Sequence, residues 1–260
     1  MYYNEVGKIP VVEFTKSEVM GEFSAIQKVQ KVVLQGGIGI CREYYPPSIA
    51  VAIRDYLTGI GRNSLPTYEP IEIGKPNFHR LNQVDERSYV KGCFHQFVFY
   101  PWNQDVFNLF ALSRELFQLK NLLSNNDPNK YLGLSGESGM VSRLAFQFYP
   151  SGQGFLNLHA DPVGEHQLVV PTASFSKKGV DFTTGGAYIQ DLEGVKHDVD
   201  SMLNLGDVVF FDATLRHGVE LIDTGSHEPW LNFSGRWTLL IATNKIAGNR
   251  TIANAIDLGN

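Results

Sequence analysis

Cysteine is scarce in this chain, whose 260 residues include only Cys41 and Cys93. Two cysteines cannot build the disulfide framework of a small secreted domain, so we expect buried free thiols in a reducing compartment. Long hydrophobic runs are also absent, and no apolar stretch approaches the length that crosses a bilayer. The first residues, MYYNEVGKIPVVEF, lack the basic start and apolar stretch of a signal peptide. The expected location is cytoplasmic.

A strong charge of one sign is missing too. Lysine and arginine number 22 against 27 acidic residues, which gives a formal net charge of −5. Duplex nucleic acid and anionic membranes attract basic patches, so neither is an expected partner. Hydrophobic residues make up 43% and charged residues 19%, which is typical of a packed globular protein. The expected partner is a small molecule, and a homodimer is left open.

The first half of the chain has mainly helical patterns. Capping signals and hydrophobic periodicity predict helices over 15–35, 46–61 and 102–124. The last of these is expected to bury one stripe of leucines: Leu109, Leu112, Leu116, Leu119 and Leu123. Two short apolar segments, GIGICREY and CFHQFVFY, predict strands.

From about residue 140 the period changes to that of β-strands. Such short, evenly spaced strands are typical of a sandwich or jelly roll and not of a parallel α/β sheet. The prediction is a mainly β single domain over 1–260, with N-terminal helices and accessory strands in 1–139, a jelly-roll or cupin-like core in 140–245 and a C-terminal tail in 246–260. The eight predicted strands are RLAFQFY, FLNLHA, HQLVVPTASF, GGAYIQD, SMLNL, DVVFFD, HGVELI and RWTLLIAT.

Polar residues that suit a metal follow some of these strands. In FLNLHAD, His159 and Asp161 are two positions apart, so a strand would direct both side chains to one point. His217 begins a later predicted strand and is a candidate third ligand. Two histidines and a carboxylate on one face of a metal leave other positions open, as in non-haem Fe(II) oxygenases. Arg236 lies in a very apolar strand, where a guanidinium is costly unless it meets an anion.

These residues and their spacing resemble the Fe(II)/2-oxoglutarate-dependent oxygenase superfamily over residues 140–245. The resemblance implies a double-stranded β-helix with helices packed outside, and it implies Fe(II), O₂ and 2-oxoglutarate as a co-substrate. His159, Asp161 and His217 would be the iron ligands and catalytic residues. Arg236 would hold the distal carboxylate of 2-oxoglutarate, with Ser234 adding a hydroxyl from the same strand face.

A narrower resemblance concerns the substrate. HADPVGEHQ, VVPTASFSKKGVDFTTGGAYI and HRLNQ are similar to a branch that acts on free amino acids, which includes lysine hydroxylases and related radical halogenases. In the halogenases a small residue replaces the metal carboxylate, so the presence of Asp161 predicts hydroxylation. The expected substrate is a free cationic amino acid such as lysine.

An amino-acid substrate needs a cation for its carboxylate and acidic or polar partners for its amines. Arg80 is the candidate carboxylate clamp, Glu137 and Asn232 are candidates at the amine end, and Trp237 is a candidate pocket wall. Each of these residues could instead have an ordinary structural role, as a surface arginine, a loop glutamate, a turn asparagine and a core tryptophan.

Two other functions are left open. One is an oxygenase of the same fold that acts on a peptidyl side chain or a natural-product intermediate. The other is a jelly-roll protein that binds a metal or ligand without turnover, including the case in which the His-x-Asp pair is a chance occurrence in a structural sandwich.

Overall fold

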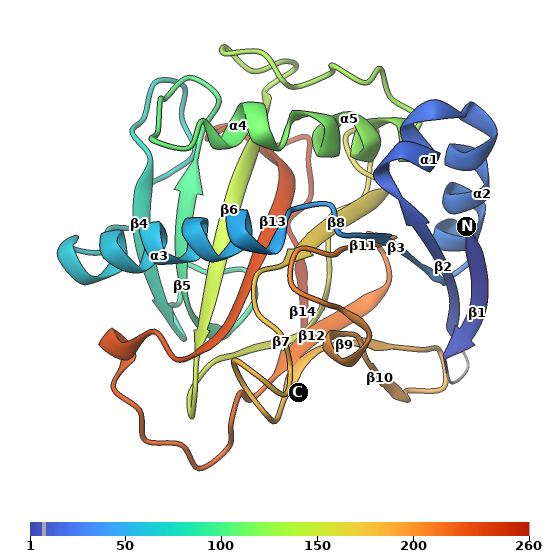
Figure 1. Ribbon diagram of the computed structural model, residues 1–260. Helices are drawn as coiled ribbons and strands as arrows, with labels where there is room; N and C mark the ends of the chain where they lie inside the picture. The colour runs from blue at the N-terminus through green and yellow to red at the C-terminus, as the bar shows by residue number, and fades with distance from the viewer. Residues whose placement is uncertain (7–8, 260) are drawn as a thin grey trace.

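The computed structural model describes residues 1–6 and 9–259, and its strands join in one 14-stranded sheet (Figure 1). The order along the main path is β1-β2-β3-β11-β8-β13-β6-β5-β7-β12-β9-β10, while β4 pairs with β5 and β14 pairs with β7. The strands are β1 (Tyr2–Val6), β2 (Ile9–Thr15), β3 (Ile38–Arg42), β4 (Phe78–Gln83), β5 (Gly92–Phe99), β6 (Met140–Pro150), β7 (Phe155–Ala160), β8 (Val169–Ser174), β9 (Gly186–Gln190), β10 (Lys196–Asp198), β11 (Val208–Asp212), β12 (Arg216–Glu220), β13 (Gly235–Lys245) and β14 (Ile256–Gly259).

The helices begin and end at residues with recognisable capping chemistry. Thr15 and Glu18 form a capping box at the start of α1, in which each side chain bonds the other residue's backbone N–H. Proline occupies the first turn of α3, where its missing N–H costs nothing. The helices are α1 (Lys16–Gly21), α2 (Phe23–Leu34), α3 (Pro47–Asn63), α4 (Leu109–Leu112) and α5 (Arg114–Leu123), and two 3₁₀ turns are η1 (Asp200–Met202) and η2 (Trp230–Asn232).

The predicted continuous helix over 102–124 is wrong. The helical segment starts only at Leu109, because Asn108 has a positive φ of 49° and the Asp105 carboxylate accepts the Leu109 N–H. A break at Ser113 then separates α4 from α5. The break turns Leu112 to the surface, where it is 38% exposed, so the leucines do not form one buried stripe.

The strand prediction is wrong for SMLNL and incomplete elsewhere. SMLNL lies in η1 and a following turn, where the Asp207 carboxylate accepts the Asn204 N–H. The segment 246–260 is more than a tail, because its β14 pairs with the strand that carries His159. β1, β2, β4 and β10 were also not predicted. Four of these five strands are short or polar, and their sheet neighbours hold them in place. β2 is the exception, because its apolar residues pack into the hydrophobic clusters.

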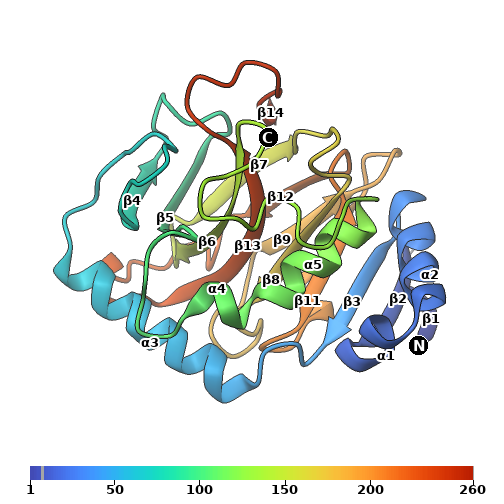
Figure 2. The ribbon, with the colours of Figure 1, turned by 90° about the horizontal axis from the view of Figure 1, so that it is seen from above.

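The strands form two facing layers. One layer contains β6, β13, β8 and β11, and the other contains β7, β12, β9 and β10. β5 pairs with both β6 and β7 and therefore joins the layers along one side. Interleaving antiparallel strands between two layers in this order is the jelly-roll arrangement. Viewed from above, α3 runs along the layer that contains β6 and β13, on the side that faces away from β7 and β12 (Figure 2).

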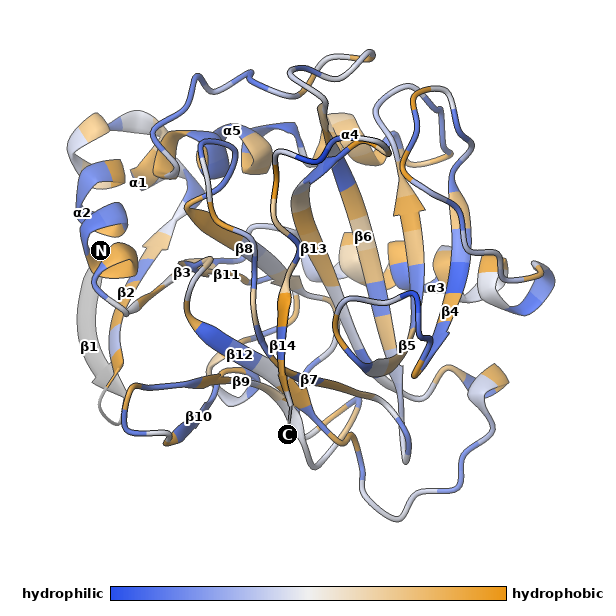
Figure 3. Cartoon of the chain, turned by 180° about the vertical axis from the view of Figure 1, so that it is seen from behind, coloured by the Kyte–Doolittle hydropathy of each residue, from blue (hydrophilic) through white to orange (hydrophobic). Residues whose placement is uncertain are grey.

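Alternation along β13 divides its side chains between two environments. Trp237, Leu239 and Ile241 belong to a large hydrophobic cluster that the layer shares with the helices. Arg236 and Thr238 point the other way, and Leu240 on that face packs against a second cluster that includes Phe211. Hydrophobic colour is concentrated along β6, β8 and β13 in Figure 3. The inner face of the sheet therefore carries polar residues such as Arg236 and Thr238 beside the apolar residues of the second cluster, and it faces the opposite layer.

Among the described residues, no helix combines the length and apolar character needed to cross a membrane.

Candidate metal centre

His159, Asp161 and His217 come together at one end of the barrel. His159 on β7 lies directly opposite His217 on β12, and their rings are 4.1 Å apart between centroids. Asp161 follows the end of β7, and its carboxylate lies 3.6 Å from His217 Nε2 and 4.0 Å from His159 Nε2. One ligand atom from each residue lies within 4.8 Å of the other two. A metal ion fits between three such atoms.

Backbone groups hold all three residues in place. Nδ1 of His159 is 2.9 Å from the Asn157 carbonyl, and Nδ1 of His217 is 2.8 Å from the Leu215 carbonyl. A carbonyl only accepts, so each Nδ1 carries the proton and each Nε2 has a free lone pair. The Asp161 N–H donates to the Ala213 carbonyl at 2.9 Å and fixes the residue after the strand ends. These contacts direct two imidazole rings and a carboxylate toward one point.

The electrostatic setting favours the metal-binding forms. Burial, with a smaller contribution from the neighbouring His159, lowers the pKa of His217 to about 4. The imidazole is therefore neutral at pH 7 and needs to lose no proton before it binds a metal. Behind the site, burial lowers the pKa of Lys120 to about 7, while the Asp161 charge opposes that shift. Lys120 donates to the His166 carbonyl and the Thr243 hydroxyl. The sequence analysis did not identify Lys120 as a site residue.

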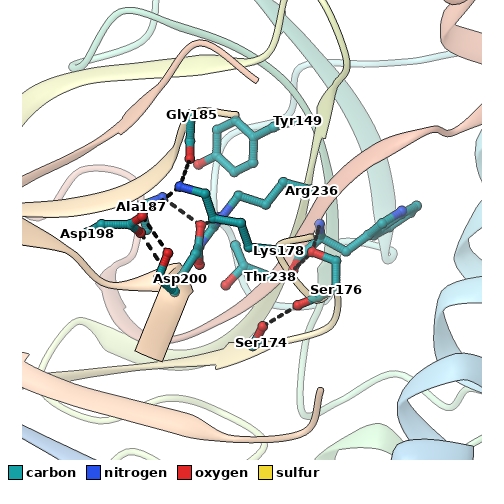
Figure 4. Close-up of polar contacts among 12 residues, drawn as sticks. Tyr149, Ser174, Ser176, Lys178, Gly185, Ala187, Asp198, Asp200, Arg236 and Thr238 are labelled. Atoms are coloured by element: carbon teal, nitrogen blue, oxygen red, sulfur yellow. Dashed lines mark hydrogen bonds and ion pairs between the residues drawn. The ribbon is translucent and has the colours of Figure 1, made fainter. Parts of the chain in front are cut away.

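Arg236 is buried on the inner face of β13, but its guanidinium is already paired. Nε donates to Asp200 Oδ2 at 2.6 Å, and Nη2 donates to Asp200 Oδ1 at 3.0 Å. Figure 4 shows this pair beside Tyr149, whose ring lies 5.5 Å from the Arg236 Cζ. The sequence correctly indicated that Arg236 meets an anion. It gave no signal for Asp200, because nothing in HDVDSM marks a buried aspartate.

No protein-family model matches the chain, and no curated protein sequence matches it. Solved structures do match. A Pseudomonas putida prolyl-4-hydroxylase aligns over 85% of this chain and 98% of its own, with a TM-score of 0.55 and 15% identity. A full-length Neurospora crassa protein solved with alpha-KG (2-oxoglutarate) and thymine aligns over 91% of this chain and 86% of its own, with a TM-score of 0.53 and 11% identity. The chain shares their fold. The mainly β, jelly-roll prediction is confirmed at this level.

Three of the remaining predicted residues lie where the sequence did not place them. β13 begins at Gly235, whose φ is 141°, so Ser234 lies before the strand and is exposed. Alternation with Arg236 therefore does not reach Ser234. Asn232 lies in η2 instead of on β13, and its amide donates to Glu228. Trp237 is 2% exposed and stacks on Phe97 in the helix-facing core, so it does not lie on the inner face with Arg236.

Arg80 lies on the same sheet face as Arg236. Arg80 on β4 is opposite Gln96 on β5, and Gln96 is opposite Gln147 on β6. Gln147 in turn is opposite Thr238, two residues along β13 from Arg236. Residues directly opposite in antiparallel strands share a face. The half-buried Arg80 side chain therefore lies on the inner face, where its Nε is buried without a hydrogen-bond partner.

Arg143 is a second inner-face arginine that the sequence analysis missed. It shares its face with Gln147 on β6, and its Nε donates to Asn244. Burial, with a smaller contribution from the nearby Arg80, lowers the pKa of Arg143 to about 10. The signal that identified Arg236, an arginine in an apolar strand, is also present in RLAFQFY. By contrast, Glu137 is exposed in the loop before β6, where it accepts the Tyr131 N–H.

Proposed function

We propose that this chain is a non-haem iron, 2-oxoglutarate-dependent dioxygenase that hydroxylates an unactivated C–H bond of a small substrate. The observation that carries the proposal is the convergence of His159, Asp161 and His217 inside a fold shared with a protein solved with alpha-KG. Imidazole suits Fe(II), and a carboxylate offsets part of its charge. Three ligands from one side leave positions for a co-substrate and O₂.

Each residue has a distinct task in this proposal. The two histidines and Asp161 would hold the ion, and their backbone contacts fix the direction of each lone pair. Fe(II), when bound, supplies the oxidising chemistry together with O₂ and 2-oxoglutarate. Arg236, deeper on the inner face, would meet the distal carboxylate of 2-oxoglutarate. The surrounding apolar side chains, such as Phe211 beside the His217 ring, limit the access of water.

We further propose a free cationic amino acid such as lysine as the substrate. Arg80 and Arg143 supply two positive charges on the inner face, and among the described residues neither forms an ion pair with a carboxylate. A substrate carboxylate would compensate charges that burial makes costly. At the amine end, Glu137 offers an exposed carboxylate, and Asn232 offers an amide oxygen. Asp161 fills the position that a halide would need, which favours hydroxylation.

Turnover and mass analysis test the proposal in two steps. The protein, supplied with Fe(II), 2-oxoglutarate and ascorbate, is expected to release succinate when lysine, ornithine or arginine is added. The amino acid should gain the mass of one oxygen atom, and the Asp161→Ala variant should give neither product. Succinate release without an oxidised amino acid would instead indicate another substrate. No succinate across a broad panel would favour a binding protein and reject the enzyme.

A further inference from the structure

The guanidinium proposed to receive the co-substrate already holds a carboxylate of the chain. Asp200 bonds the side edge of Arg236, formed by Nε and Nη2, and both side chains are almost fully buried. Asp200 is itself fixed in place, because the Ala187 N–H donates to its Oδ2 at 2.6 Å. Gly186 makes room for this contact, since a Cβ there would lie 2.6 Å from the same oxygen. The aspartate is therefore a built part of the site.

One edge of Arg236 remains available. Nη1 donates to no described residue, yet it is not among the fully buried polar atoms without a partner, so it borders accessible space. A second carboxylate can approach this end of the fork while Asp200 keeps the side edge. The nearby Lys178 adds no free charge, because its ammonium is bonded to the Asp198 carboxylate and the Gly185 carbonyl (Figure 4).

The charge count decides what this arrangement does. Arg236 and Asp200 together are neutral, so an arriving carboxylate meets one cation that two anions must share. Like charges only a few ångströms apart repel strongly in a buried site. The distal carboxylate of a keto acid therefore gains less here than it would from an arginine without an acidic partner.

We infer that Asp200 is a specificity-determining residue that weakens the preference of the site for a dicarboxylic keto acid over a monocarboxylic one. The inference rests on the proposed oxygenase function. It concerns a residue that acts through Arg236, so its effect lies in keto-acid affinity and not in the oxidation itself. Replacing the Asp200 charge should leave Arg236 as an unshared cation that favours 2-oxoglutarate.

Equilibrium binding without turnover tests this role. Protein loaded with Fe(II) under anaerobic conditions is titrated calorimetrically with 2-oxoglutarate and with 2-oxopentanoate, which has the same chain length but no distal carboxylate. The measured quantity is the ratio of the two dissociation constants. Asp200→Asn is expected to raise the preference for 2-oxoglutarate about tenfold. Asp207→Asn, which removes the charge of another buried aspartate, at the Arg42 pair, is the matched control and should leave the ratio unchanged.

Each result has a defined meaning. An unchanged or smaller preference in Asp200→Asn overturns the inference, even where wild type binds both acids. Wild type that binds neither acid rejects the proposed function as well. Asp200→Ser, whose hydroxyl can still accept the Ala187 N–H, replaces the first variant if that variant melts below the assay temperature.

Discussion

Two arginine–aspartate pairs in this molecule, Arg42–Asp207 and Arg236–Asp200, each contain a buried aspartate. They differ in how many nitrogens of the guanidinium have a hydrogen-bond partner. Arg42 donates from Nε and Nη2 to the Glu13 carboxylate, and its Nη1 donates to Asp207 and to the Met202 carbonyl. Every nitrogen of that guanidinium has a partner. Arg236 uses Nε and Nη2 on Asp200 alone, and its Nη1 donates to no described residue.

The difference separates a structural cation from one that can bind a ligand. Arg42 joins β2 and β3 to the turn before β11, so its saturated fork contributes to stability. Arg236 lies inside the barrel on the face that carries Arg80 and opposite the layer with both histidines. An arginine with an open donor edge in a barrel interior is the arrangement that a bound anion completes.

The largest effect should come from the proposed metal ligands in the barrel interior, His159, Asp161 and His217, which neither arginine pair contacts. His217→Ala is expected to lose both iron retention after dialysis and succinate release, because two donors cannot hold the ion. Asp161→Ala should lose hydroxylation. Metal content and product are measured on the same samples. Normal turnover by either variant would show that the ligand assignment is wrong.

A smaller effect on turnover distinguishes the two arginines directly. Arg236→Met should raise the KM for 2-oxoglutarate about 100-fold, because a buried charge-assisted contact is lost. Iron retention should be nearly intact, since Arg236 does not touch the metal site. Arg42→Met is the matched control, and its KM should stay at the wild-type value. Equal KM changes in both variants would remove the functional distinction between the pairs.

The structural role of Arg42 is tested through the free energy of unfolding. Arg42→Met leaves the fully buried Asp207 without its guanidinium, and breaking such a pair costs about 3 kcal/mol. Urea unfolding with a metal-free sample measures the loss. The surviving folded enzyme should keep the wild-type activity per molecule. A variant as stable as wild type would contradict the structural role of Arg42.

The sequence predicted the convergence of His159, Asp161 and His217 better than it predicted the surroundings of these residues. His159 and His217 stand in patterns that alternation and turn residues make readable, and the structure places them directly opposite each other. Asp200 and Ser234 show why the rest was not predictable. The partner of Arg236 depends on a 3₁₀ turn where a strand was predicted, and the face of Ser234 depends on where β13 begins. Local periodicity in the sequence predicts neither the 3₁₀ turn nor the residue at which β13 begins.

Two buried histidines outside the barrel interior, His79 and His95, should make the free energy of unfolding depend on pH. His79 Nε2 lies 2.8 Å from His95 Nδ1, and the outer Nε2 of His95 is buried without a partner among described residues. Burial, with a smaller contribution from His79, lowers the pKa of His95 to about 3 from a usual value of 6.5. The folded state therefore keeps His95 neutral, whereas the unfolded chain takes up a proton below pH 6.5.

This pKa shift fixes the sign of the expected effect. The stability linked to His95 is complete above pH 6.5 and is lost as the pH falls from 6.5 toward 3, because only unfolding lets the ring protonate. Between pH 7 and pH 5 the loss for one such histidine is about 2 kcal/mol. His95→Gln keeps a hydrogen-bonding partner for His79 but cannot titrate, so its free energy of unfolding should fall by about 2 kcal/mol less than that of wild type over this interval.

Other buried histidines titrate in both proteins, and the difference between the two urea curves isolates His95. Identical pH dependences would mean that His95 takes up its proton at the same pH in the folded and the unfolded chain, so that at pH 5 a positive charge would lie against Phe148 and Phe233.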